Sequence, residues 1–591
     1  MIASLPRGVR AGLLSLGLFL LGVSVGPAHA QNLQDLVVPS ITNTYAIENA
    51  RVVQAPGQVL DSATVVVQGG LIEAVGPNVE IPYDARRIRA DSLVVYAGFI
   101  DGLSHAGVKM PKSEDTNGNG DNGNDVNPGD PPPNRAGIQP DRSVRQFLSP
   151  DASSLSELRK VGFTTGHVVP KGEMLPGGGA YVFYGGETVD DMMLEPNPTL
   201  FAQIKPAEGY VYPATDMAVI AKFRQLYREA ARRQKLEEAY AKNPEGRRPP
   251  RDPIHSALFP VLNKEKPFFF YADEALPIHR VLALKSELNF PLTIAGLGES
   301  FRTVDDLQNV DAPLFLTLSL PDKPKRSPAQ DTTVADTTDQ PAKYYNPDLR
   351  TQSYRDVPEE EKNLELRHAM ARQKYLETAA TLHEAGLSFG FTTREVDAGD
   401  VRKNLRTMIE NGLPEQTALA ALTTHPASLL GLTNQLGTVE DGKIANLVVT
   451  DGPYFNKDTK VKYVFVDGRL YDYRSDDSEQ GKVTGDVSKV LGTWSYTLST
   501  PQGEFTGTFT IKGDQSGLEG TFTGPQGDTQ EMQSISFDGT TLSFSVESPQ
   551  GGTVSITVTV KQDAFEGTAT TPNGSVTITG ERTSTPSATR K

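Results

Sequence analysis

The stretch that decides the fold reads Ala420-Ala-Leu-Thr-Thr-His425-Pro-Ala-Ser-Leu-Leu-Gly431-Leu, continued by Leu436-Gly-Thr-Val-Glu-Asp-Gly-Lys443-Ile-Ala-Asn-Leu-Val-Val. Its second half opens a series of short apolar runs separated by Gly and Asp turns, which is typical of strands. The same pattern fills residues 45–98, where Gly69-Gly70 and Gly76-Pro77 provide the turns and indicate an antiparallel β layer. Strand-rich segments therefore flank the middle of the chain on both sides.

The middle of the chain, from Phe99 to about residue 433, alternates buried strands with helical periods. In Leu155-Ser-Glu-Leu158-Arg-Lys-Val161 the apolar residues have helical spacing, and a strand-like run, Gly162-Phe-Thr-Thr-Gly-His167-Val-Val, follows. This alternation predicts a parallel sheet covered by helices. Three polar stretches interrupt it, and their composition cannot bury enough apolar surface to fold alone: residues 112–143, 223–253 and 323–362. We expect surface loops in the first and third and a helical flap in the second.

The C-terminal part differs in composition. After a polar linker at residues 476–484, residues 485–584 are rich in Thr, Ser and Gly with alternating apolar positions, and a tail of residues 585–591 follows. Turn signals such as Pro525-Gln-Gly recur, so the segment predicts an all-β sandwich or small barrel of about eight strands. Its Trp494 is expected to fill a core rather than to form a sugar platform. Adhesion, ligand binding and oligomer contact stay open as roles for this domain.

The N-terminus carries the pattern of a secretory signal peptide. Arg7 and Arg10 precede an uncharged apolar run, and the small residues of Ala28-His29-Ala30 precede Gln31. We expect residues 1–30 to be removed, with cleavage near Ala30-Gln31, and the mature protein to be exported to the periplasm or the extracellular space. No segment approaches the roughly 20 apolar residues of a spanning helix, so no membrane span is expected.

Composition excludes several classes of site. The chain has no cysteine, which removes disulfides, thiolate zinc sites, a cysteine nucleophile and a lipidated cysteine anchor. The net charge of −16 argues against nucleic acid as a partner, because phosphate backbones are bound by clustered Lys and Arg.

Three segments together resemble the amidohydrolase superfamily, particularly its imidazolonepropionase-like branch. They are Val94-Val-Tyr-Ala-Gly98-Phe-Ile-Asp101-Gly-Leu-Ser-His105, Gly162-Phe-Thr-Thr and the stretch quoted first. The resemblance covers about residues 45–475 and implies a (β/α)8 TIM-like barrel over residues 99–433. It also implies a composite β-sandwich built from residues 31–98 and 434–475, since the family's last barrel helix leads back into the β layer.

The resemblance further implies one or two divalent metals at the C-terminal mouth of the barrel, where a metal activates water and polarises a carbonyl. The family's ligands are a His-x-His pair on the first strand, Lys or Glu on the fourth, His on the fifth, His on the sixth and Asp on the eighth. In this chain the matching positions hold Leu103, Tyr271, Gly296 and, at the catalytic Asp position, Thr393. His105 remains from the first pair, and Lys205 and Glu208 are candidates for the fourth strand.

His167 could complete a metal site with His105, and a hydrogen-bonded core histidine is the alternative. Three protein ligands are the usual minimum for a catalytic zinc, and a threonine hydroxyl cannot act as a base near neutral pH. The sequence therefore predicts an exported pseudoenzyme or binding protein without a bound cofactor. A small molecule or peptide would bind at the barrel mouth, and the chain could form a homo-oligomer or pair with an active homologue.

The alternative is a metal-dependent hydrolase of C–N bonds in cyclic amides, peptides or related molecules, using zinc or another divalent metal in a reduced or rebuilt site. Convergence of His105, His167 and one carboxylate at the mouth would favour this alternative.

Two other motifs resemble ligand-binding loops, but a simple loop or turn is the better interpretation of each. Asp115-Thr-Asn-Gly-Asn-Gly-Asp121 resembles the start of a calcium loop, yet its twelfth position is Val126 instead of a bidentate Glu, which favours an acidic loop. Gly177-Gly-Gly179 lacks the Lys of a phosphate-binding loop, which favours a tight turn before a strand that begins at Ala180.

Overall fold

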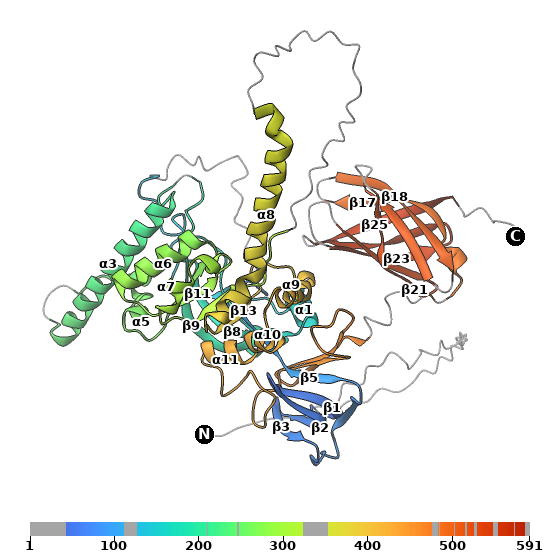
Figure 1. Cartoon of the computed structure of the whole chain (residues 1–591), viewed down its shortest axis with the longest axis horizontal. Coiled ribbons are helices and arrows are strands. Elements are labelled where there is room, and N and C mark those ends of the chain that lie inside the picture. The colour runs from blue at the N-terminus through green and yellow to red at the C-terminus, as the bar shows by residue number, and fades with distance from the viewer. Residues whose placement is uncertain are drawn as a thin grey trace, which may run out of the picture. The chain divides into compact units, whose positions relative to one another are not determined.

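The computed structural model describes residues 43–110, 127–209, 211–244, 248–322, 353–474, 483, 485–500, 503–514, 517–524, 529–547, 553–571 and 574–584. The predicted signal peptide, the calcium-like motif, the linker except for residue 483, the tail and most of the third polar stretch lie outside these ranges. The fold class predicted from the sequence is confirmed: a barrel-like α/β sheet, a composite β sheet from both flanks, and a separate all-β C-terminal domain (Figure 1). No described helix is long and apolar enough to cross a membrane.

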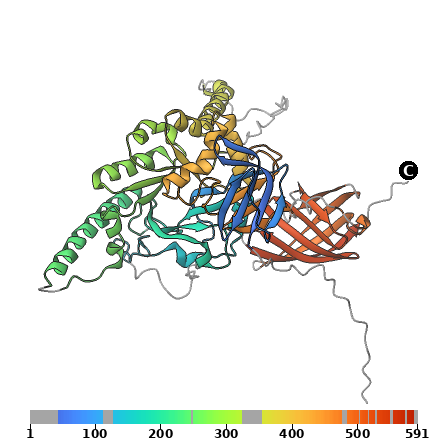
Figure 2. The same cartoon turned by 90° about the horizontal axis from the view of Figure 1, so that it is seen from below.

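The composite sheet joins the two flanks of the barrel. Its order is β16-β15-β14-β5-β1-β2-β3, with β4 paired beside β1. The flanks meet where β14 pairs antiparallel with β5, so the blue and orange strands lie side by side (Figure 2). Unlike the all-antiparallel layer expected, β1 pairs parallel with both β4 and β5. The strands are β1 (Tyr45–Ala55), β2 (Gln58–Gln68), β3 (Leu71–Gly76), β4 (Arg86–Arg89), β5 (Val94–Ala97), β14 (Leu447–Thr450), β15 (Val461–Val466) and β16 (Arg469–Asp472).

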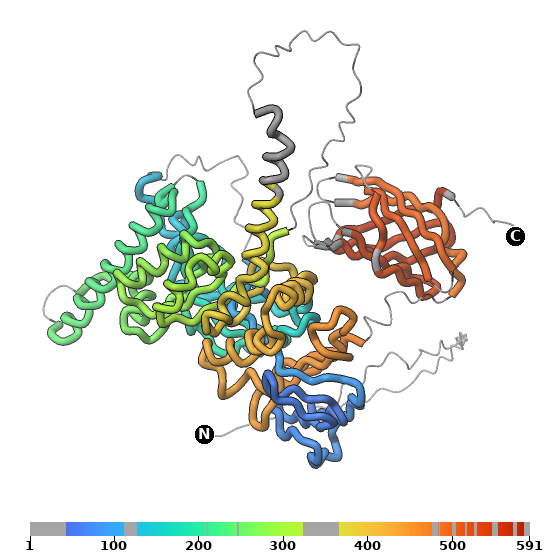
Figure 3. The backbone as a smooth tube through the Cα atoms, in the orientation of Figure 1, coloured from blue at the N-terminus to red at the C-terminus, as the bar shows by residue number. Residues whose placement is uncertain are grey.

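The barrel sheet has the order β13-β12-β11-β10-β9-β8-β7-β6. The two end strands, β13 and β6, come together so that the barrel nearly closes. There Thr392 Oγ1, at the end of β13, donates to the Leu103 carbonyl oxygen of β6. Figure 3 follows the chain through this part of the molecule, where the coils of the helices stand out in the Cα tube. The strands are β6 (Phe99–Ser104), β7 (Phe163–Val168), β8 (Gly177–Phe183), β9 (Met193–Gln203), β10 (Phe268–Ala272), β11 (Leu292–Gly296), β12 (Leu314–Thr317) and β13 (Phe389–Thr392).

One strand departs from the expected (β/α)8 pattern. β8 pairs antiparallel with both neighbours, β7 and β9, whereas the other neighbouring pairs along this path are parallel. The turn expected at Gly177-Gly-Gly179 is wrong, since these glycines belong to β8 itself. A Cβ on Gly179 would collide with the ring of His167, so glycine is required by this close packing. With β8 in third place, β9, β10, β11 and β13 are the fourth, fifth, sixth and eighth strands.

Helices follow most of the parallel strands. The predicted helix before β7 is confirmed as α1, whose buried Leu155 and Leu158 face inward. The last helical segment of the barrel is interrupted at Thr423, which separates α10 from α11. After α11 the chain returns to the composite sheet. The helices are α1 (Ser153–Lys160), α2 (Val189–Met192), α3 (Asp216–Lys242), α4 (Pro253–Ser256), α5 (Phe259–Leu262), α6 (Ala275–Leu288), α7 (Val304–Gln308), α8 (Ser353–Glu384), α9 (Ala398–Glu410), α10 (Glu415–Leu422) and α11 (Thr424–Leu429).

The second polar stretch is helical over residues 223–242, as expected, but its first turns pack against the barrel. Helix α3 begins before it, and its Phe223, Leu226 and Tyr227 are buried. The Phe223 ring packs against those of Phe268 and Phe290, because one face of this charged helix is apolar. The first and third stretches also carry structure, since Ile138 is buried and α8 begins at residue 353.

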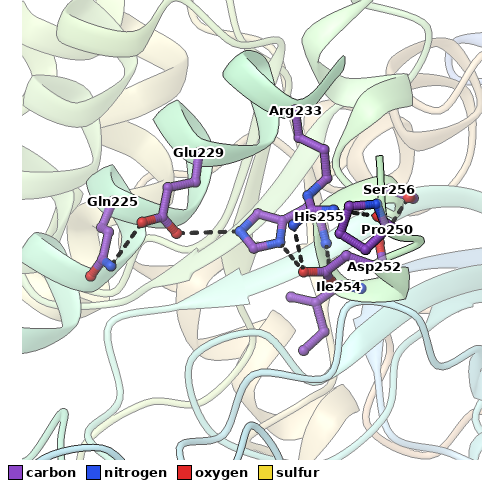
Figure 4. Close-up of polar contacts among 8 residues, drawn as sticks. All are labelled: Gln225, Glu229, Arg233, Pro250, Asp252, Ile254, His255 and Ser256. Carbon is purple, nitrogen blue, oxygen red and sulfur yellow. Dashed lines mark hydrogen bonds and ion pairs between the residues drawn. The ribbon is translucent and has the colours of Figure 1, made fainter. Parts of the chain in front are cut away.

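A polar cluster then holds α4 against α3 (Figure 4). His255 Nδ1 lies 2.6 Å from Asp252 Oδ2, and His255 Nε2 lies 3.3 Å from Glu229 Oε2. Arg233 adds an ion pair of 3.4 Å to Asp252. These contacts leave the side chain of His255 only 14% exposed.

In the described residues of the C-terminal domain, nine strands form an antiparallel meander, close to the number of about eight that we expected. β17 pairs with both β18 and β25, and the strands at the two ends of the sheet, β20 and β21, are consecutive in the chain. Trp494 is buried as predicted, and its Nε1 donates to the Val490 carbonyl oxygen. The strands are β17 (Gly492–Thr500), β18 (Gly503–Asp514), β19 (Gly517–Thr523), β20 (Thr529–Glu531), β21 (Gln533–Phe537), β22 (Thr541–Glu547), β23 (Thr553–Lys561), β24 (Ala564–Thr571) and β25 (Gly574–Ser584).

Candidate functional site at the barrel mouth

The carboxyl ends of the parallel barrel strands meet at one edge, which is where barrels of this kind carry their sites. His105 follows β6, Gln203 ends β9, Tyr271 lies near the end of β10, and Arg394 follows β13 by two residues. Gln203 and Tyr271 are direct partners in the register of β9 and β10. Four strands thus bring four polar side chains to the mouth.

The guanidinium group of Arg394 connects these side chains. Its Nε donates to His105 Nε2 at 3.2 Å, and its Nη2 donates to Gln203 Oε1 at 3.0 Å. Its central carbon lies 3.7 Å from the centroid of the Tyr271 ring, which is a cation–π contact. The Arg394 side chain is only 11% exposed, and Glu395 is its ion-pair partner at 3.3 Å. A nearly buried positive charge therefore lies among side chains from the first, fourth and fifth strands.

His105 is held as a neutral imidazole. Its Nδ1 lies 2.9 Å from the Val169 carbonyl oxygen, which can only accept, so the ring proton belongs on Nδ1. Its Nε2 accepts from Arg394. Burial, together with the positive charge of Arg394, lowers the pKa of His105 to about 4. The lone pair that could bind a metal is thus used by the arginine.

Thr393, at the position of the family's catalytic Asp, belongs to a buried network around Asp101. The Thr393 hydroxyl donates to Asp101 Oδ2, and its backbone N–H donates to Oδ1 at 3.0 Å. The Tyr184 hydroxyl also donates to Oδ2, at 3.0 Å, and the Leu103 N–H to Oδ1, at 3.2 Å. Burial raises the pKa of Asp101 to about 6, although these hydrogen bonds oppose the shift. The network ties β13 to β6 rather than presenting a base to substrate.

The other degenerate positions offer no metal donor. Leu103 is fully buried and packs with Phe201, Phe269 and Phe315 in an apolar layer inside the barrel. Gly296 has a φ of 103°, and a Cβ there would approach the Ala272 carbonyl oxygen at 2.9 Å, so the backbone itself requires glycine. The hydroxyl of Tyr271 has its pKa raised above the ordinary value by burial, which keeps it neutral.

His167 is not brought together with His105. It is fully buried, its Nε2 lies 2.7 Å from Thr199 Oγ1, and its ring centroid lies 4.1 Å from that of Phe269. These surroundings match the core histidine that we gave as the alternative.

The fourth strand ends in Gln203, not in either residue that we named as a candidate. Lys205 and Glu208 follow β9 in exposed positions, and Lys205 Nζ lies 3.9 Å from Glu173. Sequence reasoning missed both Gln203 and Arg394. The signal for Arg394 was a charged residue two positions after the last strand, following the buried Thr392 and Thr393. The signal for Gln203 is its register partner Tyr271, which a single sequence does not reveal.

The residues at the mouth do not fit a divalent metal. One imidazole, an amide, a phenol and a guanidinium are not a ligand set for zinc, which binds neutral imidazoles and carboxylates. Among the described residues, no group of three His, Asp or Glu side chains is placed to hold a metal ion. The positive charge of Arg394 would also repel a cation.

Comparison with known proteins bears on this fold. Residues 346–471 match the model of the Amidohydrolase family. An amidohydrolase from Thermotoga maritima MSB8 is 20% identical over 72% of this chain and 100% of its own, with a TM-score of 0.55. A prolidase in complex with N-methylphosphonate-L-proline is 16% identical over 73% of this chain and 99% of its own, with a TM-score of 0.41. A beta-aspartyl dipeptidase from Fervidobacterium islandicum AW-1 is 12% identical over 73% and 96%, with a TM-score of 0.36.

No curated protein sequence matches this chain significantly. The Thermotoga structure shows the barrel fold, and the match to the family model includes α8, the last barrel strand β13 and the strands β14 and β15 of the composite sheet. The resemblance to the amidohydrolase superfamily is thereby confirmed, and the chain has a barrel fold similar to that of the Thermotoga amidohydrolase.

Proposed function

We propose that this protein is a non-catalytic relative of the metal-dependent amidohydrolases, which binds a small molecule or peptide at the barrel mouth without hydrolysing it. The observation that carries the proposal is the position of the Arg394 guanidinium, in contact with His105, Gln203 and Tyr271. The cationic side chain of Arg394 is hydrogen-bonded to the His105 nitrogen that a metal would need.

The chemistry of hydrolysis supports the same conclusion. Metal-assisted hydrolysis needs an ion to generate hydroxide near neutral pH and a base to take the proton from water. The unprotonated nitrogen of His105 accepts a hydrogen bond from Arg394. The Thr393 hydroxyl donates a hydrogen bond to Asp101 and so is not available as a base. His105, Tyr271 and Arg394 are partly buried and none is fully buried, so a ligand at the mouth can still contact them, and binding is the use of the mouth that we propose. Pairing with an active homologue, or with a second copy, stays an expectation from the sequence.

Metal content and activity test this proposal. The purified mature protein is expected to hold well under one equivalent of zinc, manganese or iron after dialysis, since a single imidazole binds these metals weakly. It should not hydrolyse cyclic amides or dipeptides when the metals are added back, and His105→Ala should behave identically. Stoichiometric retained metal, with activity that His105→Ala abolishes, would overturn the proposal and favour the rebuilt hydrolase site.

We also propose that the protein is exported and begins at Gln31, on the strength of the basic, apolar and small-residue pattern of residues 1–30. Mass spectrometry of the N-terminal peptide of exported protein should start at Gln31. Detection of residues 1–30 on the exported chain would show that this assignment is wrong.

A further inference from the structure

Helix α8 packs on the barrel with its later turns only, and its earlier turns extend away from the barrel strands (Figure 1). Ala379 and Leu382 are buried and belong to the barrel core. In contrast, all six residues from 366 to 371 are exposed. Six consecutive residues point in every direction around a helix, so no other described element covers any face of this part of α8.

These exposed turns are apolar. Leu364, Leu366 and Met370 are 46%, 53% and 67% exposed. They are three of the ten large apolar side chains that are exposed in the described part of the chain, yet they lie within seven residues. Leu366 and Met370 are four positions apart and share one helix face with Ala369. Single exposed apolar residues are ordinary, whereas a cluster of them is typical of a surface that another chain covers.

A groove lies next to the exposed turns, where α8 reaches the barrel. It has a volume of about 760 Å³ and lies between α8, α9 and the residues that follow β12. Leu320 and Leu376 give it apolar walls, and Asn404 and Thr407 add polar groups from α9. A second helix lying along the exposed turns of α8 would therefore find room to continue beside the barrel.

The charges of α8 indicate which helix fits there. Residues 353–365 include five acidic residues against two basic ones, whereas residues 366–376 include three basic residues and no acidic one. The helix dipole accounts for acidic residues near the start of a helix, but not for basic residues in its middle. An identical helix running antiparallel would place each acidic half opposite a basic half. The acidic residues are Asp356, Glu359, Glu360, Glu361 and Glu365, and the basic ones are Arg355 and Lys362, then Arg367, Arg372 and Lys374.

We propose that the face of α8 formed by Leu366, Ala369 and Met370 pairs in antiparallel orientation with α8 of a second copy of this chain. The apolar residues of the two copies would pack together across a two-fold axis, which is the commonest symmetry of protein assemblies. Arg372 and Lys374 of each copy would lie along the acidic half of the partner helix. This surface shares no residue with the barrel mouth, so the pairing is independent of the function proposed there.

Sedimentation-velocity ultracentrifugation of the full mature protein over a range of concentrations tests this pairing. We expect a monomer–dimer equilibrium, and Leu366→Ser/Met370→Ser should weaken the dimer by at least about tenfold. Met217→Ser/Leu236→Ser removes the same two kinds of side chain from comparably exposed positions on α3 and should leave the equilibrium unchanged. Because all four positions are exposed, thermal unfolding should show that both variants remain folded.

A charge exchange tests the antiparallel orientation. Glu360→Lys/Glu361→Lys gives both halves of α8 a net positive charge, and Arg367→Glu/Arg372→Glu gives both halves a net negative charge. Like charges would oppose pairing in each variant alone, so both should be monomeric, and an equimolar mixture of the two should recover the dimer. A mature protein that stays monomeric, equal weakening in the Met217→Ser/Leu236→Ser control, or a mixture that does not recover the dimer would overturn the proposal.

Discussion

Replacing Asp101 by leucine is expected to lower the free energy of unfolding of the barrel by about 3–5 kcal/mol, the range for removing one partner from a buried charged network. The carboxylate accepts hydrogen bonds from Thr393, Tyr184 and Leu103, and leucine would leave all these donors buried without an acceptor. Circular dichroism during urea unfolding measures the loss.

The chain supplies an internal control for this measurement. Trp494 is the only tryptophan and lies in the C-terminal domain, so its fluorescence reports that domain alone. The fluorescence transition should keep its midpoint in Asp101→Leu. An unchanged circular dichroism transition would mean that the Asp101 network does not hold β13 against β6.

Asp101 also predicts how stability depends on pH. Burial raises its pKa from 3.8 to about 6 in the folded protein, so between these values the folded state holds the proton more tightly than the unfolded state. The contribution of Asp101 is therefore largest below pH 4 and falls as pH rises toward 6, by about 3 kcal/mol in all. Asp101→Asn keeps the shape and cannot ionise, so it should remove this fall. The same fall in the asparagine variant would assign the pH dependence to other groups.

Replacing Arg394 by alanine is expected to lower the free energy of unfolding by about 2–4 kcal/mol, from the loss of charged hydrogen bonds and a desolvated cation–π contact. His105 Nε2 and Gln203 Oε1 would lose their donor. The pKa of His105 should also rise from about 4, because the charge of Arg394 is the second cause of its depression after burial. Histidine-selective NMR during a pH titration measures this change.

Arg394→Lys is the matched control for that change. It keeps a positive charge at the mouth but cannot bridge His105 and Gln203 while stacking on Tyr271. We therefore expect Arg394→Lys to lose stability as alanine does while the pKa of His105 stays low. A stable Arg394→Ala with an unmoved His105 pKa would show that the guanidinium does not organise the mouth.

Local patterns in the sequence predicted a helix-covered parallel sheet with strand-rich flanks, and the resemblance to the family implied that these form a barrel and a composite sheet. The periodicity around Leu155 and Leu158 and the strand-and-turn pattern after Leu436 both depend on neighbours in the chain. The antiparallel course of β8 could not be predicted, because Gly177-Gly-Gly179 is a turn signal unless His167 and Thr199 are known to pack against it.

At the barrel mouth, the sequence predicted which metal ligands are missing, but not which side chains take part instead. Leu103, Tyr271 and Thr393 could be placed by resemblance to the family's strands, and each lies on or directly after the expected strand. Arg394 and Gln203 belong to different strands, and their contact depends on the closure of the barrel and the register of β9 with β10. Neither property is visible in local spacing, so the arginine that links the strands was missed.

The most direct test of the central claim is a crystal structure of the mature protein grown with excess zinc. We predict that the Arg394 guanidinium will lie between His105 and Gln203 over the Tyr271 ring, with no anomalous zinc signal at the mouth. A zinc ion bound to His105, with Arg394 turned away from Gln203, would contradict the account.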